Sequence, residues 1–596
     1  MPVNELRGYG AGHTLRVMRS RLASFALVAS CLVPLAAVPS RPPNAFATFV
    51  DRYLDEFATR HPSIASGNGI HEHDDVLDDF SADAVHHEIV ALKRSRAQLR
   101  AFSTTQLTAD ERVDRKILDG IIDGWLLEQE TLQNWRRNPM IYASALSDGV
   151  HNLMTMENSP APIRMRQMIH KLADVPKLLG AARTNIVNPP KLFAQRGVVM
   201  MRGVSDMLAN DVRLAFVSQE HTALMDSLVR ATASARILVD AYATWLDTDV
   251  VPTANGDFAI GGANVARRYR AEELIDVPLS DLIALGEREL ANGQREFRAA
   301  ADRLAPGRDP QTTWLHVRRN HPKRGDVVAA TQQLVDSLTT FVMARQLATI
   351  PKGERVLVAP APAFDLGFAS MHASPPLERV PVKSIFYITD ANADMTPAEQ
   401  ESWLERYNYA SLANTAAHEA MPGHWLHSTY MRRTPGKIRR IWIGLNPFPQ
   451  PSSGQDGWAH YAEQLMVEEK FGDGDARLQL AQLSDALTRV CRLLSGIKLH
   501  TKAWTFDDAQ ACFEQQAYVA APAARREAER AAYDPTYGGY FLGKRGLLTL
   551  RRDYKAKLGP TFDLRAFHER IMTNGIAPIW AHRQLLLPGN TARVIQ

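Results

Sequence analysis

Apolar residues recur at three- and four-residue spacing along most of this chain, and this spacing constrains the fold more than any other feature of its sequence. Two β-branched or aromatic runs, residues 354–360 and 382–389, are the best strand signals. The sequence therefore predicts a mainly α fold with a small sheet. We expect helices over residues 46–60, 84–103, 106–134, 205–247, 327–349, 396–430, 456–470, 479–502 and 505–518.

A segment rich in Gly, Asn and Pro, residues 251–265, interrupts the helical pattern. This composition is typical of a connection between structural units. With 596 residues and 45% hydrophobic composition, the chain can form more than one lobe. We therefore expect an N-terminal helical lobe over residues 46–250 and a C-terminal lobe over residues 251–596.

Residues 1–40 have the pattern of an export signal. A basic start precedes an apolar run over residues 22–38, which is too short and too interrupted by proline for a comfortable membrane span. The sequence VASC indicates a lipid anchor at Cys31, and ordinary cleavage between residues 37 and 47 is an alternative. A basic start followed by a buried core helix is a third interpretation. We expect an exported protein, either periplasmic or a membrane-anchored lipoprotein.

The net charge and the cysteines do not favour a nucleic-acid-binding protein or one with a C-x-x-C motif. Residues 1–37 hold four arginines and one glutamate, a +3 share of the net charge of +4, so the remainder is close to neutral. This balance gives no argument for binding nucleic acid. Cys491 and Cys512, the two cysteines after Cys31, have no C-x-x-C partner. We expect both to be small core residues, and the sequence does not decide whether they form a disulfide.

The stretch NTAAHEAMPGHWLH suggests a metal site with altered spacing. In the zinc-peptidase motif H-E-x-x-H, two histidines one helical turn apart bind the metal. Here His424 follows His418 by six residues, which on a regular helix turns the two side chains about 120° apart. Pro422 removes a helical N–H and Gly423 frees the backbone. We therefore expect a helix break that returns His424 towards His418, with Glu419 as general base.

A second polar group follows about thirty residues later, in the sequence GQDGWAHYAEQLMVEEK. Asp456, His460 and Glu463 fall on one helix face, opposite an apolar face. A zinc ion needs three protein ligands and one open position, so a carboxylate from this face would complete a two-histidine, one-carboxylate set. A solvated helix face is the alternative for a lone His-Glu pair.

Three blocks, HEAMPGH, DGWAHYAE and PTYGGYFLGK, resemble the signature blocks of the bacterial family called domain of unknown function 885. The resemblance covers roughly residues 46–590. It implies an exported or lipoprotein zinc metallopeptidase with a two-lobed helical fold and a small sheet near the active site. Such a fold is similar to those of thimet oligopeptidase, carboxypeptidase Taq and angiotensin-converting enzyme.

The resemblance also implies residue roles. His418, His424 and Asp456 would bind Zn²⁺, and Glu419 would activate water. Tyr540 would donate a hydrogen bond to a developing oxyanion.

Four further residues take supporting roles in this interpretation. Glu463, with His460 on the same face, would orient a metal-binding histidine. His500 and Arg530 would hold a substrate carboxylate or carbonyl, with a structural ion pair as the alternative for each.

The chain departs from the family pattern in three places. Asp456 stands where Glu is usual, Trp425 and His427 follow the motif, and residues 495–498 lack the usual Asp and Gly. These changes bear on metal affinity and substrate, because strained sites tolerate few changes.

The leading hypothesis is an exported zinc peptidase that cleaves short peptides. The alternatives are a catalytically degenerate binding or scaffold protein of the same fold, and a metal-dependent hydrolase of a non-peptide amide or ester. Peptide preference, exo- or endopeptidase action and oligomeric state do not follow from the sequence.

Overall fold

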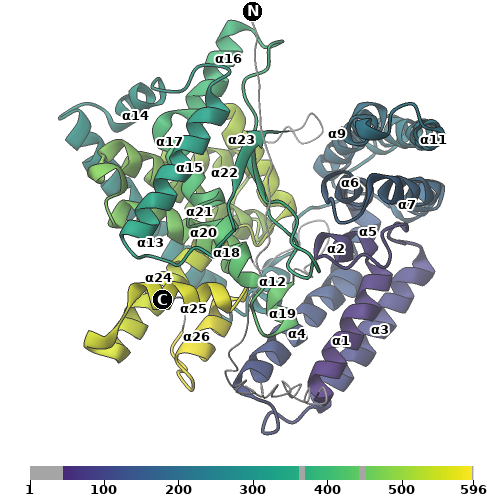
Figure 1. Cartoon of the computed structure of the whole chain (residues 1–596), viewed down its shortest axis with the longest axis horizontal. Coiled ribbons are helices and arrows are strands. Elements are labelled where there is room, and N and C mark those ends of the chain that lie inside the picture. Colours follow the sequence, from purple (N-terminus) through teal and green to yellow (C-terminus); the bar gives the residue numbers. More distant parts are fainter. Residues whose placement is uncertain (1–43, 362–368, 442–451, 594, 596) are drawn as a thin grey trace, which may run out of the picture. The chain divides into compact units, whose positions relative to one another are not determined.

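The computed structural model describes residues 44–361, 369–441, 452–593 and 595, which are mainly helical and include one three-stranded sheet (Figure 1). Residues from Ala45 onwards form one compact unit. The predicted export signal and Cys31 lie outside the described residues. Within the described ranges, every helix is too short or too polar to cross a bilayer. The predicted lobe boundary at residues 250 and 251 stays a prediction.

The elements described between residues 44 and 250 are all helical. They are α1 (Ala45–Arg60), α2 (Pro62–Gly67), α3 (Ala82–Ala101), α4 (Ala109–Leu126), η1 (Leu127–Leu132), α5 (Asn134–Arg137), α6 (Met140–Thr155), α7 (Ala161–Ala173), α8 (Val175–Asn185), α9 (Lys191–Asp206), η2 (Met207–Asp211), α10 (Val212–Ala215), η3 (Val217–Gln219), α11 (Ala223–Trp245) and η4 (Leu246–Val250).

The middle of the chain contains the sheet. Its elements are α12 (Gly262–Glu272), α13 (Leu279–Leu304), α14 (Pro310–Arg318), α15 (Val327–Ala344), β1 (Leu357–Pro360), β2 (Ala369–His372), β3 (Ile385–Ile388), α16 (Pro397–Leu404), η5 (Glu405–Tyr407), α17 (Tyr409–Glu419), α18 (His424–Met431) and α19 (Lys437–Arg440).

The C-terminal part is again helical. It consists of α20 (Ser452–Glu468), η6 (Phe471–Gly474), α21 (Ala476–His500), α22 (Phe506–Ala511), η7 (Cys512–Gln516), α23 (Ala521–Tyr533), α24 (Gly539–Leu558), η8 (Gly559–Thr561), α25 (Leu564–Thr573) and α26 (Ile579–Leu586).

Two predicted helices are divided in the structure. In the stretch 205–247, the helical run of α9, η2 and α10 ends at Ala215, and α11 starts at Ala223, because Thr222 caps it by accepting a hydrogen bond from the backbone N–H of Met225. The prediction of one continuous helix is wrong there. The stretch 396–430 contains α16, η5, α17 and α18, and Asn408 caps α17. The division before α17 was not predicted, whereas a break at Pro422 was.

The sheet lies beside the helix that carries the first histidine of the motif. Strand β3 lies between β1, to which it is parallel, and β2, to which it is antiparallel. Buried Phe386 of β3 shares a core cluster with Ala416 and Ala417 of α17, and β2 also contacts α17. Strands β1 and β3 fall within the two predicted runs, whereas β2 was not expected.

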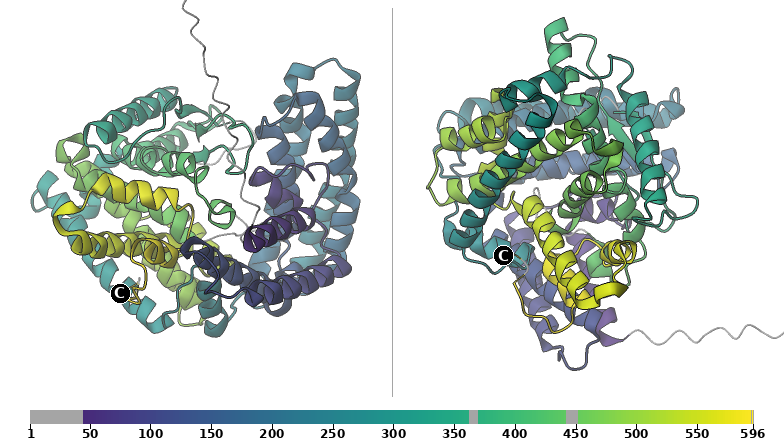
Figure 2. Two further views of the ribbon diagram at one scale, coloured as in Figure 1. Left: turned by 60° about the horizontal axis from the view of Figure 1, so that its bottom comes forward. Right: turned by 90° about the vertical axis from the view of Figure 1, so that its left-hand side faces the viewer.

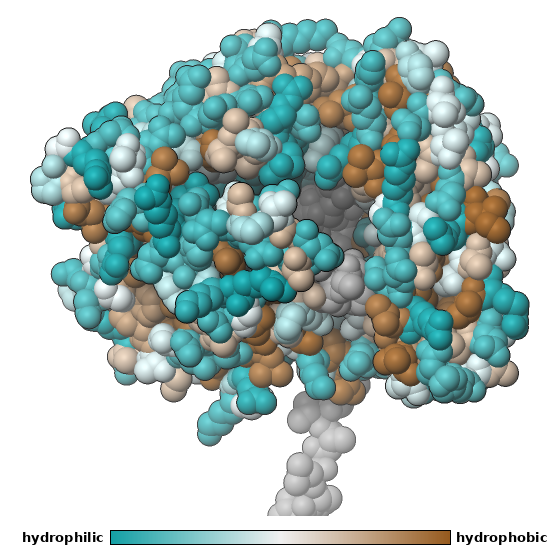
Figure 3. Space-filling view, turned by 90° about the horizontal axis from the view of Figure 1, so that it is seen from above, coloured by the Kyte–Doolittle hydropathy of each residue, from teal (hydrophilic) through white to brown (hydrophobic). Residues whose placement is uncertain are grey.

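Helices α20, α21 and α24 pack against one another, and α13 packs along α21. Residues of α20, α21 and α24, coloured green to yellow, lie together in both views of Figure 2. One face of the molecule is mainly hydrophilic, with apolar side chains scattered among polar ones (Figure 3), as expected for a surface open to water.

Helices α20 and α24 cross at two glycines. A Cβ on Gly457 would lie 2.6 Å from the Cα of Gly543, and a Cβ on Gly543 would lie 2.3 Å from the carbonyl oxygen of Ser453. Neither distance is compatible with a side chain, so the two backbones are in direct contact. This crossing lies next to Asp456 on α20 and one turn from Tyr540 on α24.

Cys491 and Cys512 form a disulfide that joins α21 to η7, with Cα atoms 5.8 Å apart. Both residues are buried in the core around α13 and α21. The expectation of core positions is confirmed, and the pairing that the sequence left open is present. Such bonds persist in oxidising compartments.

Candidate metal centre

The helix break predicted at Pro422 is present. Helix α17 ends at Glu419 and α18 begins at His424, with a cis peptide bond between Met421 and Pro422. The indole Nε1 of buried Trp458, on α20, donates a hydrogen bond of 2.9 Å to the carbonyl oxygen of Pro422. The break is therefore attached to the helix that supplies the candidate carboxylate ligand.

Replacing Gly423 with alanine is expected to destabilise the protein by about 3 kcal/mol and to weaken metal binding. A Cβ at this position would lie 1.7 Å from the carbonyl oxygen of His418, so the break would have to open. Chemical denaturation measures the effect. Gly180→Ala is the matched control, because a Cβ there meets nothing within 4 Å and should stabilise α8 by about 0.5–1 kcal/mol. Equal stability of the two variants would contradict the argument.

The break brings both histidines to one carboxylate. The rings of His418 and His424 are 4.7 Å apart between centroids and are nearly perpendicular. Their Nε2 atoms lie 3.8 and 3.6 Å from Oδ1 of Asp456, and the three candidate ligand atoms lie within 4.8 Å of one another. Ligands held 2.0–2.1 Å from a tetrahedral zinc are about 3.4 Å apart, so the trio fits such an ion with a small contraction.

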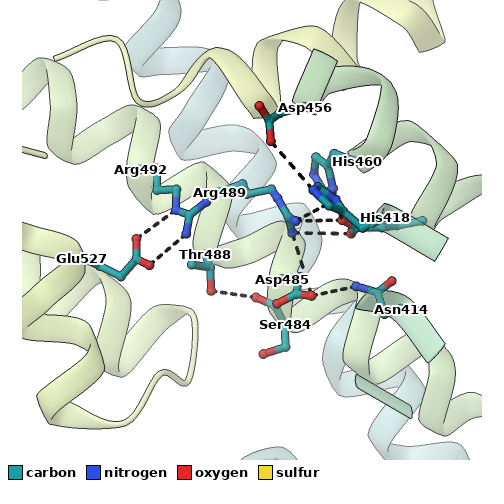
Figure 4. A network of polar contacts seen from close by, with 11 residues as sticks. Asn414, His418, Asp456, His460, Ser484, Asp485, Thr488, Arg489, Arg492 and Glu527 are labelled. Atoms are coloured by element: carbon teal, nitrogen blue, oxygen red, sulfur yellow. Dashed lines mark hydrogen bonds and ion pairs between the residues drawn. The ribbon is translucent and has the colours of Figure 1, made fainter. Parts of the chain in front are cut away.

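A buried carboxylate binds the ring of the first histidine of the motif. Glu463 on α20 accepts a hydrogen bond of 2.7 Å from Nδ1 of His418, which leaves Nε2 to face Asp456. Figure 4 shows His460 and Arg489 close to His418. Oε2 of Glu463 contacts Nδ1 of His460 at 3.1 Å, and Arg489 on α21 donates a hydrogen bond of 2.7 Å to Oε1, the oxygen that also accepts from His418. The hydrogen bond from His418 is the contact that the predicted role of Glu463, orienting a metal-binding histidine, requires.

Arg489 was not predicted from the sequence. Its Nη2 lies between Oε1 of Glu463, at 2.7 Å, and Nδ1 of His418, at 3.3 Å. Arg489 lies in a sequence segment whose apolar residues recur at helical spacing, so the sequence shows it only as a polar residue of an amphipathic helix. Only the packing of α21 against α17 and α20 brings it to the site.

Charges around the cluster favour the metal-binding forms of His418 and Asp456. Burial, together with the positive charges of His424 and Arg489, holds the pKa of His418 well below its usual range, so the imidazole is neutral. Burial opposes ionisation of Asp456, but a hydrogen bond and the charge of His424 outweigh it and lower the pKa of that carboxyl. A neutral imidazole and an ionised carboxylate are the forms that bind zinc, so His418 and Asp456 are in the binding form. Burial opposes protonation of His424, but a hydrogen bond and the negative charge of Asp456 outweigh it and raise the pKa of that imidazole, so His424 must lose its proton to bind the ion.

Glu419 adjoins the cluster and is half-buried. Burial raises its pKa to about 7, against the opposing charge of His424 and with help from the negative charge of Asp456. A carboxyl that titrates near neutral pH can both accept and return a proton, which suits a general base.

Tyr540 lies at the start of α24, beside the glycine crossing. Burial and the charge of Asp456 raise its pKa to about 12, so its hydroxyl remains a donor. Nη2 of Arg530 donates a hydrogen bond of 3.2 Å to that hydroxyl. The structure therefore places Tyr540 and Arg530 in contact near the cluster.

His500 lies elsewhere and is held by backbone groups. Its Nδ1 accepts a hydrogen bond from the N–H of Ile260 at 3.2 Å, and its Nε2 contacts the carbonyl oxygen of Ala531 at 3.0 Å. Both ring nitrogens are engaged, so these contacts favour the structural alternative over substrate binding. His460 is buried behind the site, within the Glu463 network.

These features define a mainly helical protein with a candidate metal centre of two histidines and one carboxylate beside a buried glutamate. Residues 62–585 match the model of the family described as bacterial protein of unknown function, DUF885. The chain belongs to this family, as the sequence blocks predicted. Among curated proteins, none matches the chain.

Two solved structures share the fold. One is a candidate lipoprotein of unknown function from Shewanella oneidensis, 22% identical, with a TM-score of 0.76 over 91% of this chain and 100% of that chain. The other is a candidate lipoprotein from Colwellia psychrerythraea, 16% identical, with a TM-score of 0.75 over 91% of this chain and 98% of that chain.

Proposed function

We propose that this protein is an exported zinc-dependent peptidase that hydrolyses short peptides. The observation that carries the proposal is the convergence of His418, His424 and Asp456 next to Glu419. A zinc ion held by the three ligands would polarise a peptide carbonyl and lower the pKa of water. The metallopeptidase-like fold that the family resemblance implies is part of the same proposal.

The side chains of the site have distinct roles in this reaction. Glu419 takes a proton from the attacking water and returns it to the leaving amine. Tyr540 donates a hydrogen bond to the oxyanion that develops on the substrate carbonyl. Glu463 keeps His418 in the tautomer that presents Nε2 to the metal.

The proposed location is outside the cytoplasm, in the periplasm or on a membrane through a lipid at Cys31. Three observations support it: the predicted export signal, the Cys491–Cys512 disulfide, and the description of the two structural relatives as candidate lipoproteins.

Zinc content tests the proposal. The full chain, purified without chelators, is expected to hold about one zinc ion, and His424→Ala is expected to hold almost none, because two ligands do not retain the ion. Elemental mass spectrometry measures both. His170→Ala is the control, since His170 is 70% exposed on α7.

The alternatives predict other results. Native protein without zinc would contradict the peptidase proposal and favour the degenerate binding protein. Zinc-loaded protein that hydrolyses esters but not a peptide library would favour the hydrolase of non-peptide substrates.

A further inference from the structure

Three arginines lie near the candidate metal centre, and two of them are committed to carboxylates. Arg489 donates to Glu463. Arg492 binds Glu527 through two parallel hydrogen bonds of 2.9 Å (Figure 4). A bidentate pair of this kind fixes the positions of both side chains.

Arg530, on α23, is less engaged. Its side chain is 40% exposed, and the closest carboxylate oxygen, on Asp534, is 3.8 Å away, beyond hydrogen-bond distance. The guanidinium lies 4.1 Å from the ring centroid of Tyr537, which holds its plane, and it donates to Tyr540. Among the described residues, this last bond is its only side-chain hydrogen bond, so its other N–H donors have no hydrogen-bond partner there.

The contact with Tyr540 limits the distance between Arg530 and the carbonyl group of a bound substrate. If the Tyr540 hydroxyl donates to the oxyanion, that oxygen lies about 3 Å from it. The Arg530 guanidinium is 3.2 Å from the same hydroxyl. The Arg530 guanidinium then lies at most about 6 Å from the oxyanion, which is less than the length of two extended residues, so it can reach the residue next to the scissile bond.

We propose that Arg530 binds the free C-terminal carboxylate of the substrate, so that the enzyme removes the last residue of a peptide. The inference rests on the proposed function, and it makes the protein an exopeptidase that acts at the C-terminus of its substrate. Water adds across the final peptide bond, the C–N bond breaks, and the proton passes to the amine of the released amino acid. A planar fork of donors suits a carboxylate and discriminates against an amide, which carries no charge.

Binding measurements test the inference without turnover. The probes are N-acetyl-tetraalanine and its C-terminal amide, titrated calorimetrically into the zinc-loaded Glu419→Gln chain. The free acid is expected to bind about 10- to 100-fold more tightly than the amide, the range of a charge-assisted hydrogen-bond pair. Adding Arg530→Gln is expected to reduce the affinity for the acid to that for the amide. Arg530→Lys should retain part of the preference.

Arg525→Gln is the matched control, because Arg525 lies on the same helix, is 45% exposed and pairs with Glu529. It should leave the preference unchanged, and thermal unfolding checks that each variant is folded. Equal affinities for acid and amide, no binding of the acid, or a preference that survives Arg530→Gln would overturn the inference.

Hydrolysis by the unmodified zinc-loaded chain separates this inference from the proposed function. Release of alanine from the acid, with at least about 30-fold lower kcat/KM for the amide, is expected on the same energetic grounds. Equal hydrolysis of both probes would leave the peptidase proposal standing and overturn the role of Arg530. Hydrolysis of neither, with Arg530-dependent binding of the acid, would overturn the peptidase proposal and leave the carboxylate site.

Discussion

Glu419→Gln is expected to lower kcat/KM for peptide hydrolysis by about 1,000-fold, within the range for loss of a general base. The amide has nearly the shape of the carboxyl but cannot take a proton from water. Burial already brings the pKa of Glu419 to about 7, so a neutral group at this position costs little stability. Steady-state kinetics with a short peptide measures the loss.

The control for this variant is its metal content and its unfolding temperature, both of which should match those of the unmodified chain. Glu72→Gln, at a side chain that is 61% exposed, should leave kinetics and stability unchanged. Activity within tenfold of normal in Glu419→Gln would rule out Glu419 as the base.

Glu463→Ala is expected to destabilise the protein by about 3–5 kcal/mol and to weaken zinc binding about 10- to 100-fold. Glu463 is fully buried and balances Arg489, so its removal leaves an unpaired charge in the interior. His418 loses the partner that fixes its tautomer. Urea denaturation of the metal-free chain and zinc titration measure the two effects separately.

Glu468→Ala is the matched control on the same helix. Its ion pair with Arg551 is near the surface, where such pairs contribute about 0–1 kcal/mol. Adding Arg489→Met to Glu463→Ala should recover part of the stability, because the unpaired charge is removed. Glu463→Ala that is no less stable than Glu468→Ala would mean that Arg489 finds another partner.

Local chemistry made the helix break predictable. Pro422 and Gly423 act on the backbone within one turn, so their effect does not depend on distant parts of the fold. The face shared by Asp456 and Glu463 was predictable for the same reason, because helical spacing alone places them together.

Features that depend on packing between distant segments were not predictable. Helix α6 is buried on nearly all sides, so its sequence lacks the periodic contrast that reveals a helix with one exposed face. Arg489 looks like an ordinary charged residue on α21 until that helix is packed beside Glu463. Strand β2 depends on pairing with β3, whose residues come more than ten positions later.

The Cys491–Cys512 bond makes the free energy of unfolding depend on the redox state of the compartment that contains the protein. Closing a loop with a sequence separation of 21 stabilises a protein by about 3 kcal/mol, and that contribution exists only after oxidation. Cys491 lies two residues after Arg489 on α21, so the bond anchors the helix from which Arg489 supports the metal cluster. A copy retained among cytosolic reductants would be the weaker form and the easier target for intracellular proteases.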